Sequence, residues 1–125
     1  MSTMLHKAKE SWELAEDFRN ADVGLNFSAN RFYYSLYQIA DEFNRSPNGK
    51  KFKKAEKQSF HKLMIQVVRD SLPIGKTNLL DAFNELRDLR VQADYTPEEI
   101  ELSDLDDGLV DEAKELFTLF EAKLT

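Results

Sequence analysis

Apolar side chains recur every three or four residues along most of the chain, a spacing typical of amphipathic α-helices. The pattern predicts five helical segments, over about residues 2–18, 27–44, 60–72, 79–93 and 109–124. Apolar and polar residues do not alternate over any extended stretch, so the pattern does not favour a β-sheet. The chain is therefore expected to be all-α.

Turn-forming residues separate the predicted helices. The first pattern is interrupted at 20–24, a Ser-Pro-Asn-Gly turn occupies 46–49, and Pro73 with Gly75 makes the next connection. Because short connections place neighbouring helices antiparallel, we expect an up-and-down bundle of four long helices plus a fifth short or C-terminal helical segment. The length of the chain is that of one domain, over residues 1–125.

Two helix-start signals lie between the fourth and fifth predicted helices. Thr96 has the character of an N-cap, Pro97 suits the first helical turn, and Glu99 takes the capping-box position. The Ser-Asp-Leu-Asp sequence of 103–106 repeats the signal directly before the last helix. We interpret the acidic residues there as favouring the positive end of a helix, because their spacing does not fit a calcium loop.

The composition excludes several classes of site. The 125 residues are 42% hydrophobic and 32% charged, which suits a helix-rich globular protein. The sequence contains no Cys, which excludes disulfides, thiolate zinc sites and a Cys nucleophile. His6 and His61 are too far apart for a local metal motif, so neither a metal nor a cofactor is expected. No apolar run approaches the roughly 18 residues of a membrane span, and the N-terminus has no signal-peptide core, so we expect a cytoplasmic protein outside the membrane.

The charges are distributed unevenly. The formal net charge is −6, yet residues 94–125 hold 11 acidic residues and two Lys. The preceding 93 residues hold 12 acidic and 15 basic residues. Within 50–62 there are six Lys and one Glu. This segment is either a solvated, lysine-rich helix start or a surface that attracts a phosphate backbone through salt-sensitive contacts.

Two segments contain polar and aromatic residues that a simple helical core does not require. In the second predicted helix, Arg31 lies close to Tyr33 and Tyr34 and could stack on their rings or hold an anion. In the fourth, Arg90 and Asp94 have the i, i+4 spacing of a surface ion pair. The two Arg residues either pair with acids across the bundle or form one wall of a phosphate site. The sequence has no phosphate-binding glycine loop, nucleophile elbow or His-Glu-x-x-His motif.

Three motifs, taken in order, resemble those of the HEPN family, the higher eukaryotes and prokaryotes nucleotide-binding domain. They are Asn-Arg-x-Tyr-Tyr at 30–34, Ser-Phe-His-Lys at 59–62 and Leu-Arg-x-x-Ala-Asp-Tyr at 89–95. The resemblance is to the small, single-domain prokaryotic type and covers nearly the whole chain. It implies a compact helical bundle that dimerises. Active members of the family are metal-independent ribonucleases, whereas others are non-catalytic modules that bind RNA or nucleotides and are often encoded beside a nucleotidyltransferase as toxin and antitoxin.

The chain departs from the ribonuclease pattern of that family. In active members an Arg is followed, four to six residues later, by a His that moves protons. Here Gln92 takes that place after Arg87, and Tyr95 takes it after Arg90. Gln cannot exchange a proton near neutral pH, and a Tyr hydroxyl with an ordinary pKa of about 10 is a poor base there. The resemblance therefore favours a binding module over a nuclease.

We predict a non-catalytic helical module that binds RNA or a nucleotide and pairs with a second copy of itself or with a nucleotidyltransferase. The ligand-binding residues that the resemblance implies are Arg31, Tyr33, Tyr34, Arg90, Asp94 and Tyr95. The alternative is a metal-independent ribonuclease with a degenerate motif, whose candidate catalytic residues are Arg87, Arg90, His61 and Tyr95. A helical dimer with a structural or regulatory role and no nucleic-acid contact is the third hypothesis.

Overall fold

The computed structural model describes residues 3–125, and every long regular element in it is a helix. The elements are α1 (Thr3–Asn20), α2 (Leu25–Arg45), α3 (Phe60–Ser71), α4 (Thr77–Tyr95), the 3-10 turn η1 (Leu102–Leu105) and α5 (Asp107–Leu124). These described residues contain no strand, so the prediction of an all-α fold is confirmed. Four helices of 18 to 21 residues accompany one shorter helix, α3, of 12 residues.

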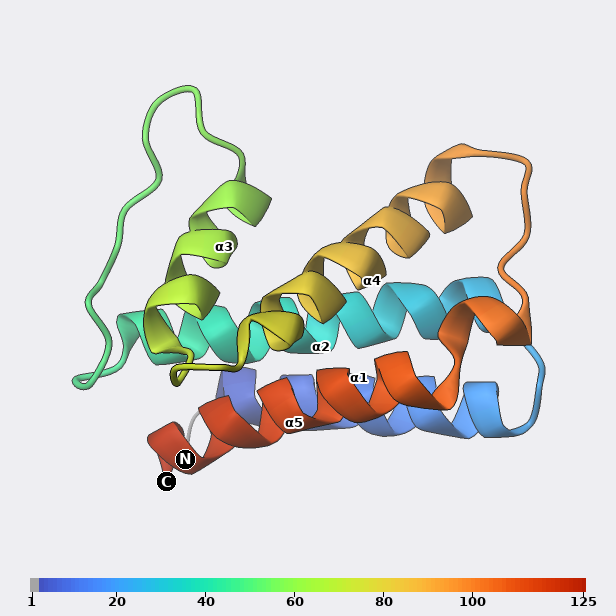
Figure 1. Cartoon of the computed structure of the whole chain (residues 1–125), viewed down its shortest axis with the longest axis horizontal. Helices are drawn as coiled ribbons and strands as arrows, with labels where there is room; N and C mark the ends of the chain where they lie inside the picture. Colours follow the sequence, from blue (N-terminus) through green and yellow to red (C-terminus); the bar gives the residue numbers. More distant parts are fainter. Residues whose placement is uncertain (1–2) are drawn as a thin grey trace.

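Helix α2 runs through the centre of the bundle and packs against each of the other four α-helices (Figure 1). Helices α1 and α5 lie on one side of α2, and α3 and α4 lie on the other. The turn at 72–76 joins α3 to α4, and the two helices diverge from that turn. The beginning of α3 and the second half of α4 are therefore held apart above α2.

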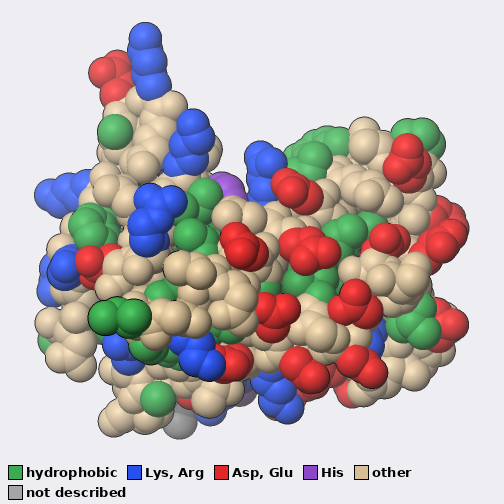
Figure 2. Space-filling view, viewed as in Figure 1, with side chains coloured by type: hydrophobic (Ala, Val, Ile, Leu, Met, Phe, Trp, Pro, Cys, Tyr) green, Lys and Arg blue, Asp and Glu red, His purple; other side chains and the backbone are tan. Residues whose placement is uncertain are grey.

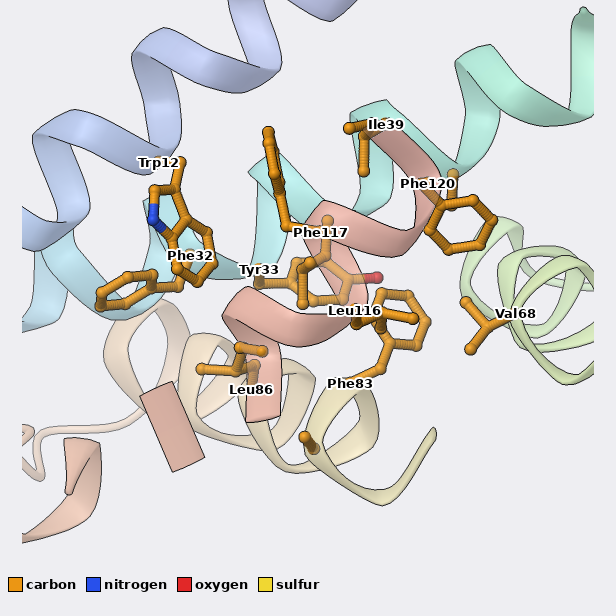
Figure 3. Close-up of a cluster of buried hydrophobic side chains, with 14 of the residues drawn as sticks. Trp12, Phe32, Tyr33, Ile39, Val68, Phe83, Leu86, Leu116, Phe117 and Phe120 are labelled. Atoms are coloured by element: carbon orange, nitrogen blue, oxygen red, sulfur yellow. The ribbon is translucent and has the colours of Figure 1, made fainter. Parts of the chain in front are cut away.

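Aromatic side chains fill much of the core (Figure 3). Trp12 of α1 packs edge-on against Phe32 of α2, with ring centroids 4.9 Å apart, and lies 5.5 Å from Phe117 of α5. Phe32, Phe83 and Phe120 are fully buried. Burial of a large apolar side chain contributes about 1.5–3 kcal/mol, so contacts of this kind hold α2 between the two helix pairs.

The start signal at Thr96 does not open a helix. Thr96 Oγ1 instead donates to the Gln92 carbonyl over 2.8 Å and closes the end of α4. Residues 96–101 form an extended connection, in which the Ile100 N–H donates to Asn26 Oδ1 of α2 over 2.8 Å. Burial of Ile100 and this hydrogen bond outweigh the local capping preference, so the helical turn suggested by the sequence does not form.

Helix α5 begins where the second start signal predicts, but its capping residue is Asp106 and not Ser103. Asp106 accepts a hydrogen bond from the Leu109 N–H over 2.8 Å and caps the helix. Ser103 lies inside η1. The acidic residues of this segment therefore act at a helix N-terminus, as the sequence indicates.

The lysine-rich segment is mostly a loop, which corrects its interpretation as a helix start. Residues 46–59 connect α2 to α3 without a helix, and Lys62 alone among the six Lys lies in α3. Asn44, buried in α2, accepts from the Phe52 N–H over 2.9 Å and donates to the Phe52 carbonyl over 3.0 Å. The Asn44 side chain thus satisfies backbone groups that a helix would have paired, and the loop is fixed in an extended path.

The charges divide between two ends of the face shown in Figure 2. Lys and Arg side chains gather over α3 and the 46–59 loop, whereas Asp and Glu side chains gather over α4 and α5. The basic and acidic residues, which are unevenly distributed along the sequence, are therefore also separated on this face of the folded protein. No helix within residues 3–125 is long and apolar enough to cross a membrane.

Candidate functional site

A cavity of about 310 Å³ opens where α2, α3 and α4 meet, in the hollow between the diverging helices (Figure 2). The lining residues are Tyr33, Tyr34 and Tyr37 of α2, Ser59, Phe60 and His61 at the start of α3, and Arg87 and Arg90 of α4. We call this cavity the tyrosine pocket. Its lining contains two guanidinium groups and no carboxylate. Such a surface attracts anions.

Helix α2 supplies the floor of the tyrosine pocket. Tyr33 and Tyr37 are four residues apart and therefore share one face of the helix, with ring centroids 6.2 Å apart. The Tyr33 ring is buried and stacks on Phe83 of α4 at 5.5 Å. Burial raises the pKa of Tyr33 far above its ordinary value, and the neighbouring Tyr37 raises it further. The Tyr33 hydroxyl is therefore protonated throughout the physiological range and acts as a hydrogen-bond donor.

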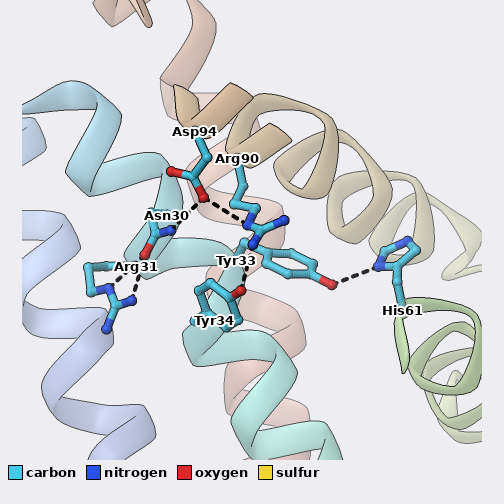
Figure 4. Close-up of polar contacts among 7 residues, drawn as sticks. All are labelled: Asn30, Arg31, Tyr33, Tyr34, His61, Arg90 and Asp94. Carbon is cyan, nitrogen blue, oxygen red and sulfur yellow. Dashed lines mark hydrogen bonds and ion pairs between the residues drawn. The ribbon is translucent and has the colours of Figure 1, made fainter. Parts of the chain in front are cut away.

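His61 stands at the start of α3, which Ser59 caps by accepting from the Lys62 N–H over 3.1 Å. The His61 ring stacks on Phe83, with centroids 5.0 Å apart and planes at 17°. Its Nδ1 lies 2.8 Å from the Tyr33 hydroxyl (Figure 4). Capping and stacking together fix the ring at the wall of the tyrosine pocket.

Both ring nitrogens of His61 have partners in the neutral tautomer. The Nε2–H donates to Asn84 Oδ1 over 2.9 Å, and Nδ1 accepts from the protonated Tyr33 hydroxyl. Burial lowers the pKa of His61, and the positive charge of Arg87 lowers it further, although the hydrogen bond to Asn84 acts in the opposite direction. His61 is therefore a neutral residue engaged with α2 and α4 at neutral pH.

Arg90 is held by contacts from α2 and from its own helix. It donates to the Tyr34 hydroxyl over 2.8 Å, and its Nε lies 3.1 Å from Asp94 Oδ2 (Figure 4). Its guanidinium carbon lies 5.3 Å from the Tyr34 ring centre and 5.4 Å from that of Tyr95. Burial lowers the pKa of Arg90, but Tyr34, Tyr95 and Asp94 raise it by more, so the net shift is upward.

Arg31 also contacts the ring of Tyr34. Its guanidinium carbon lies 5.5 Å from the Tyr34 ring centre and 5.7 Å from that of Phe27. Its Nε donates to Asn30 Oδ1 over 3.0 Å, and no carboxylate of residues 3–125 forms an ion pair with it. Two guanidinium groups therefore share one aromatic ring, and of these two cations Arg90 is the one that forms an ion pair with Asp94.

Arg87 is the least constrained cation of the tyrosine pocket. Its side chain is half exposed, and its ion pair is with the neighbouring Asp88 at 3.6 Å, beyond hydrogen-bond distance. An exposed pair of this kind contributes little to stability. The Arg87 guanidinium is therefore available to a ligand in a way that the Arg90 guanidinium is not.

The structure brings together most of the site residues named from the sequence. Tyr33, Tyr34 and Arg90 of the implied ligand set line the tyrosine pocket, and so do His61 and Arg87, two of the candidate catalytic residues. Arg31 and Asp94 lie beside the pocket, in the contacts around Tyr34, and do not line it.

Tyr95 does not line the tyrosine pocket. Its side chain is 71% exposed, and its ring centre lies 5.4 Å from the Arg90 guanidinium carbon. Tyr37 lines the pocket and was absent from the implied ligand set, although its i, i+4 spacing from Tyr33 is a visible signal. Asn84, which orients His61, carries no signal in the sequence, because it meets His61 only when α3 and α4 pack together.

The chemistry that this arrangement offers is anion binding and hydrogen bonding. The part of the chain that the structure describes contains no group of three His, Asp or Glu side chains placed to hold a metal ion. Comparison of the chain with models of protein families, with curated proteins and with solved structures finds no match.

Proposed function

We propose that this protein is a non-catalytic module that binds RNA or a nucleotide by holding a phosphate in the tyrosine pocket. The observation that carries the proposal is that Arg87 and Arg90 line one pocket whose lining contains no acids, and that the ion pair of Arg87 with Asp88 is exposed and 3.6 Å long. Guanidinium groups bind phosphate oxygens through paired, charge-assisted hydrogen bonds. The Tyr34 and Tyr37 hydroxyls and rings add donors and flat apolar surfaces for a base.

The sequence resemblance supports the same proposal. The three HEPN-like motifs supply Tyr33 and Tyr34, then His61, then Arg90, and all four residues line the tyrosine pocket. Under this proposal the protein is a HEPN-like domain that works with a nucleotidyltransferase partner in a toxin–antitoxin pair. Co-purification of the protein with a nucleotidyltransferase encoded beside it tests that part of the proposal.

We also propose that the protein forms a homodimer through the apolar surface around the turn between α1 and α2. The exposed apolar side chains there are Leu14, Phe18, Val23 and Phe27, of which Phe18 and Phe27 pack together with ring centroids 5.0 Å apart. Pairing of such faces removes apolar surface from water. Light scattering on the purified protein is expected to give the mass of a dimer, and substitution of Phe27 by Asp is expected to give a monomer.

Binding of labelled RNA and of AMP in the absence of metal tests the proposed function. Arg87→Ala is expected to weaken the binding of both by about tenfold, because a charge-assisted contact to phosphate is lost. Arg69→Ala is the matched control, since Arg69 is an exposed residue of α3 outside the tyrosine pocket. Equal binding by wild type and Arg87→Ala would contradict the assignment of the pocket.

A ribonuclease is the second candidate function, favoured by one observation. His61 lies in the same pocket as Arg87, so an acid–base group and a phosphate-binding group are close together. The proposal is nevertheless for binding alone, because Tyr33 and Asn84 occupy both ring nitrogens of His61. The labelled RNA is therefore expected to stay intact. Cleavage that disappears in His61→Ala, in a protein that still folds, would establish the ribonuclease instead.

A further inference from the structure

A second hollow, of about 400 Å³, lies next to the tyrosine pocket. The lining residues are Tyr37, Asp41, Asn44, Arg45, Lys51, Phe52, Lys53, Lys54, Phe60 and Leu63. We call it the lysine hollow. Tyr37 and Phe60 line both the lysine hollow and the tyrosine pocket, so the two are joined across these two rings.

The lysine hollow is cationic and its lysines are free of carboxylate partners. Its one acid, Asp41, pairs with Arg45 at 3.2 Å. The Lys51 and Lys54 ammonium groups donate hydrogen bonds to backbone carbonyl oxygens, and among residues 3–125 no ion pair forms with either of them or with Lys53. Carbonyl contacts leave the positive charge uncompensated, so the hollow attracts a polyanion.

The lysines are presented by a fixed segment. Asn44 holds the backbone of Phe52 through two hydrogen bonds, of 2.9 and 3.0 Å. Gly49 runs so close to the carbonyl oxygens of Phe43 and Asn44 that a side chain at this position would clash with the backbone. The loop therefore keeps a defined position beside α2, which lowers the entropy lost when its lysines bind a ligand.

Phe60 stands at the junction between the two cavities. Its side chain is 58% exposed, although it is a large apolar group at the first position of α3. Lys54 Nζ lies 5.6 Å from the centre of its ring. An exposed aromatic ring beside a cation, between two cationic cavities, has the features of a base-stacking platform.

We infer that a single strand of RNA runs from the tyrosine pocket across Phe60 into the lysine hollow, with one base stacked on the Phe60 ring. This inference rests on the proposed function and extends it from one phosphate to a strand of several nucleotides. A base can reach the ring only when it is unstacked from its neighbours, so the surface selects single strands over duplexes. The acidic surface of α4 and α5 repels the backbone and confines the strand to this side of the protein (Figure 2).

Affinity measurements with AMP and with a single-stranded oligo(A) of about eight nucleotides test the inference on the full chain. Phe60→Ala is expected to weaken oligo(A) binding by about tenfold, because stacking of one base is lost. Because Phe60 also lines the tyrosine pocket, AMP binding is measured with the same variant and is expected to fall by much less than oligo(A) binding. Phe60→Trp is expected to retain the affinity. Ile74→Ala is the control, since Ile74 is a fully exposed apolar residue that lines neither cavity.

The lysines are tested through the salt dependence of oligo(A) binding. Replacing Lys51, Lys53 and Lys54 together by Gln is expected to reduce the slope of log affinity against log salt by about 2, since each phosphate contact to a single strand contributes about 0.7. An unchanged slope overturns the path through the lysine hollow. AMP binding is expected to be the same as in wild type.

Three outcomes separate this inference from the proposed function. In the first outcome, AMP binds, but oligo(A) binds no more tightly than AMP or its binding does not respond to Phe60→Ala. This outcome overturns the strand path and leaves the tyrosine pocket as a nucleotide site. Binding of neither probe overturns both proposals. Equal binding of duplex RNA, or binding to phosphatidylserine vesicles as strong as to oligo(A), overturns the selection of a single strand and assigns the lysines to another polyanion.

Discussion

Asn30 of α2 donates from its Nδ2 to Asp94 Oδ2 of α4 over 3.2 Å (Figure 4). The same carboxylate oxygen faces the Nε of Arg90 at 3.1 Å, and the other end of the Asn30 amide accepts from Arg31. One neutral side chain thereby connects two cations and one anion. The connection fixes the last turn of α4 against α2, and it holds Asp94 where its carboxylate partly neutralises the charge of Arg90.

The Asp94→Asn substitution is expected to lower stability and to raise ligand affinity together. The free energy of unfolding should fall by about 1 kcal/mol, because a partly exposed ion pair is lost. AMP should bind several-fold more tightly, because Arg90 then keeps its full charge toward the tyrosine pocket. Urea unfolding and AMP titration measure the two effects.

Glu115→Gln is the matched control for the change at Asp94. Glu115 pairs with Lys76 at 2.9 Å in an exposed position away from the pocket, and the substitution removes the same formal charge. A comparable gain in AMP affinity for Glu115→Gln would assign the effect to net charge and not to Arg90.

Tyr34→Phe and Tyr34→Leu separate the hydroxyl of Tyr34 from its ring. Tyr34→Phe removes the hydrogen bond from Arg90 and is expected to cost about 0.5–1.5 kcal/mol of stability. Tyr34→Leu also removes the ring that both Arg31 and Arg90 cover, and it is expected to cost at least about 0.5 kcal/mol more. Equal losses in the two variants, measured by urea unfolding, would show that the ring contributes nothing beyond its hydroxyl.

The His61 contribution to stability is expected to depend on pH with a defined sign. Because burial and Arg87 lower the pKa of folded His61 below its ordinary value, the unfolded chain takes up the proton first as the pH falls. The contribution is therefore complete above the ordinary pKa of about 6.5 and is lost as the pH falls through that value toward the folded pKa.

Thermal unfolding at about pH 7.5 and about pH 5.5 measures this dependence against the ordinary histidine pKa. Wild type is expected to lose more stability than His61→Gln between the two conditions. The raised pKa of Glu85, caused by burial and then by Asp106, acts in the opposite direction but is common to both proteins and cancels in the comparison. Parallel pH profiles would contradict the prediction.

The Asn44→Ala substitution is expected to release the 46–59 loop. The two hydrogen bonds to Phe52 are lost within a buried environment, which should cost about 1–3 kcal/mol of unfolding free energy. Trypsin is then expected to cleave after the loop lysines at lower protease concentration than in wild type. Asn48→Ala, an exposed change in the same loop, is the control and should leave the cleavage pattern as it is.

The helices could be predicted from the sequence because each has an apolar stripe that stays in phase over three or more turns. The start of α3 was also predictable, because Ser59 caps it through a local contact with Lys62. Signals of this kind involve residues a few positions apart, and the structure confirms them wherever tertiary packing agrees with them.

The remaining features depend on contacts between distant segments. Thr96 has a suitable capping sequence, but Ile100 is buried against the core and its N–H pairs with Asn26. The Lys-rich segment has the composition of a helix start, but Asn44 holds it as a loop. Of the ligand-binding residues implied by the motifs of α2 and α4, the tyrosine pocket is lined by Tyr33, Tyr34 and Arg90 but not by Arg31, Asp94 or Tyr95. The placement of Arg87 in the same pocket as His61 required the packing of α3 against α4.

The tyrosine pocket forms only when the chain folds, because α2, the start of α3 and α4 each contribute lining residues. A ligand that binds there binds the folded chain and not the unfolded one, so a higher ligand concentration shifts the folding equilibrium toward the folded state. Once the site is nearly saturated, each further tenfold rise in ligand concentration adds about 1.4 kcal/mol to the free energy of unfolding. Occupancy would also oppose local separation of α3 from α4, so the melting temperature of this small bundle would report on any ligand bound in the pocket.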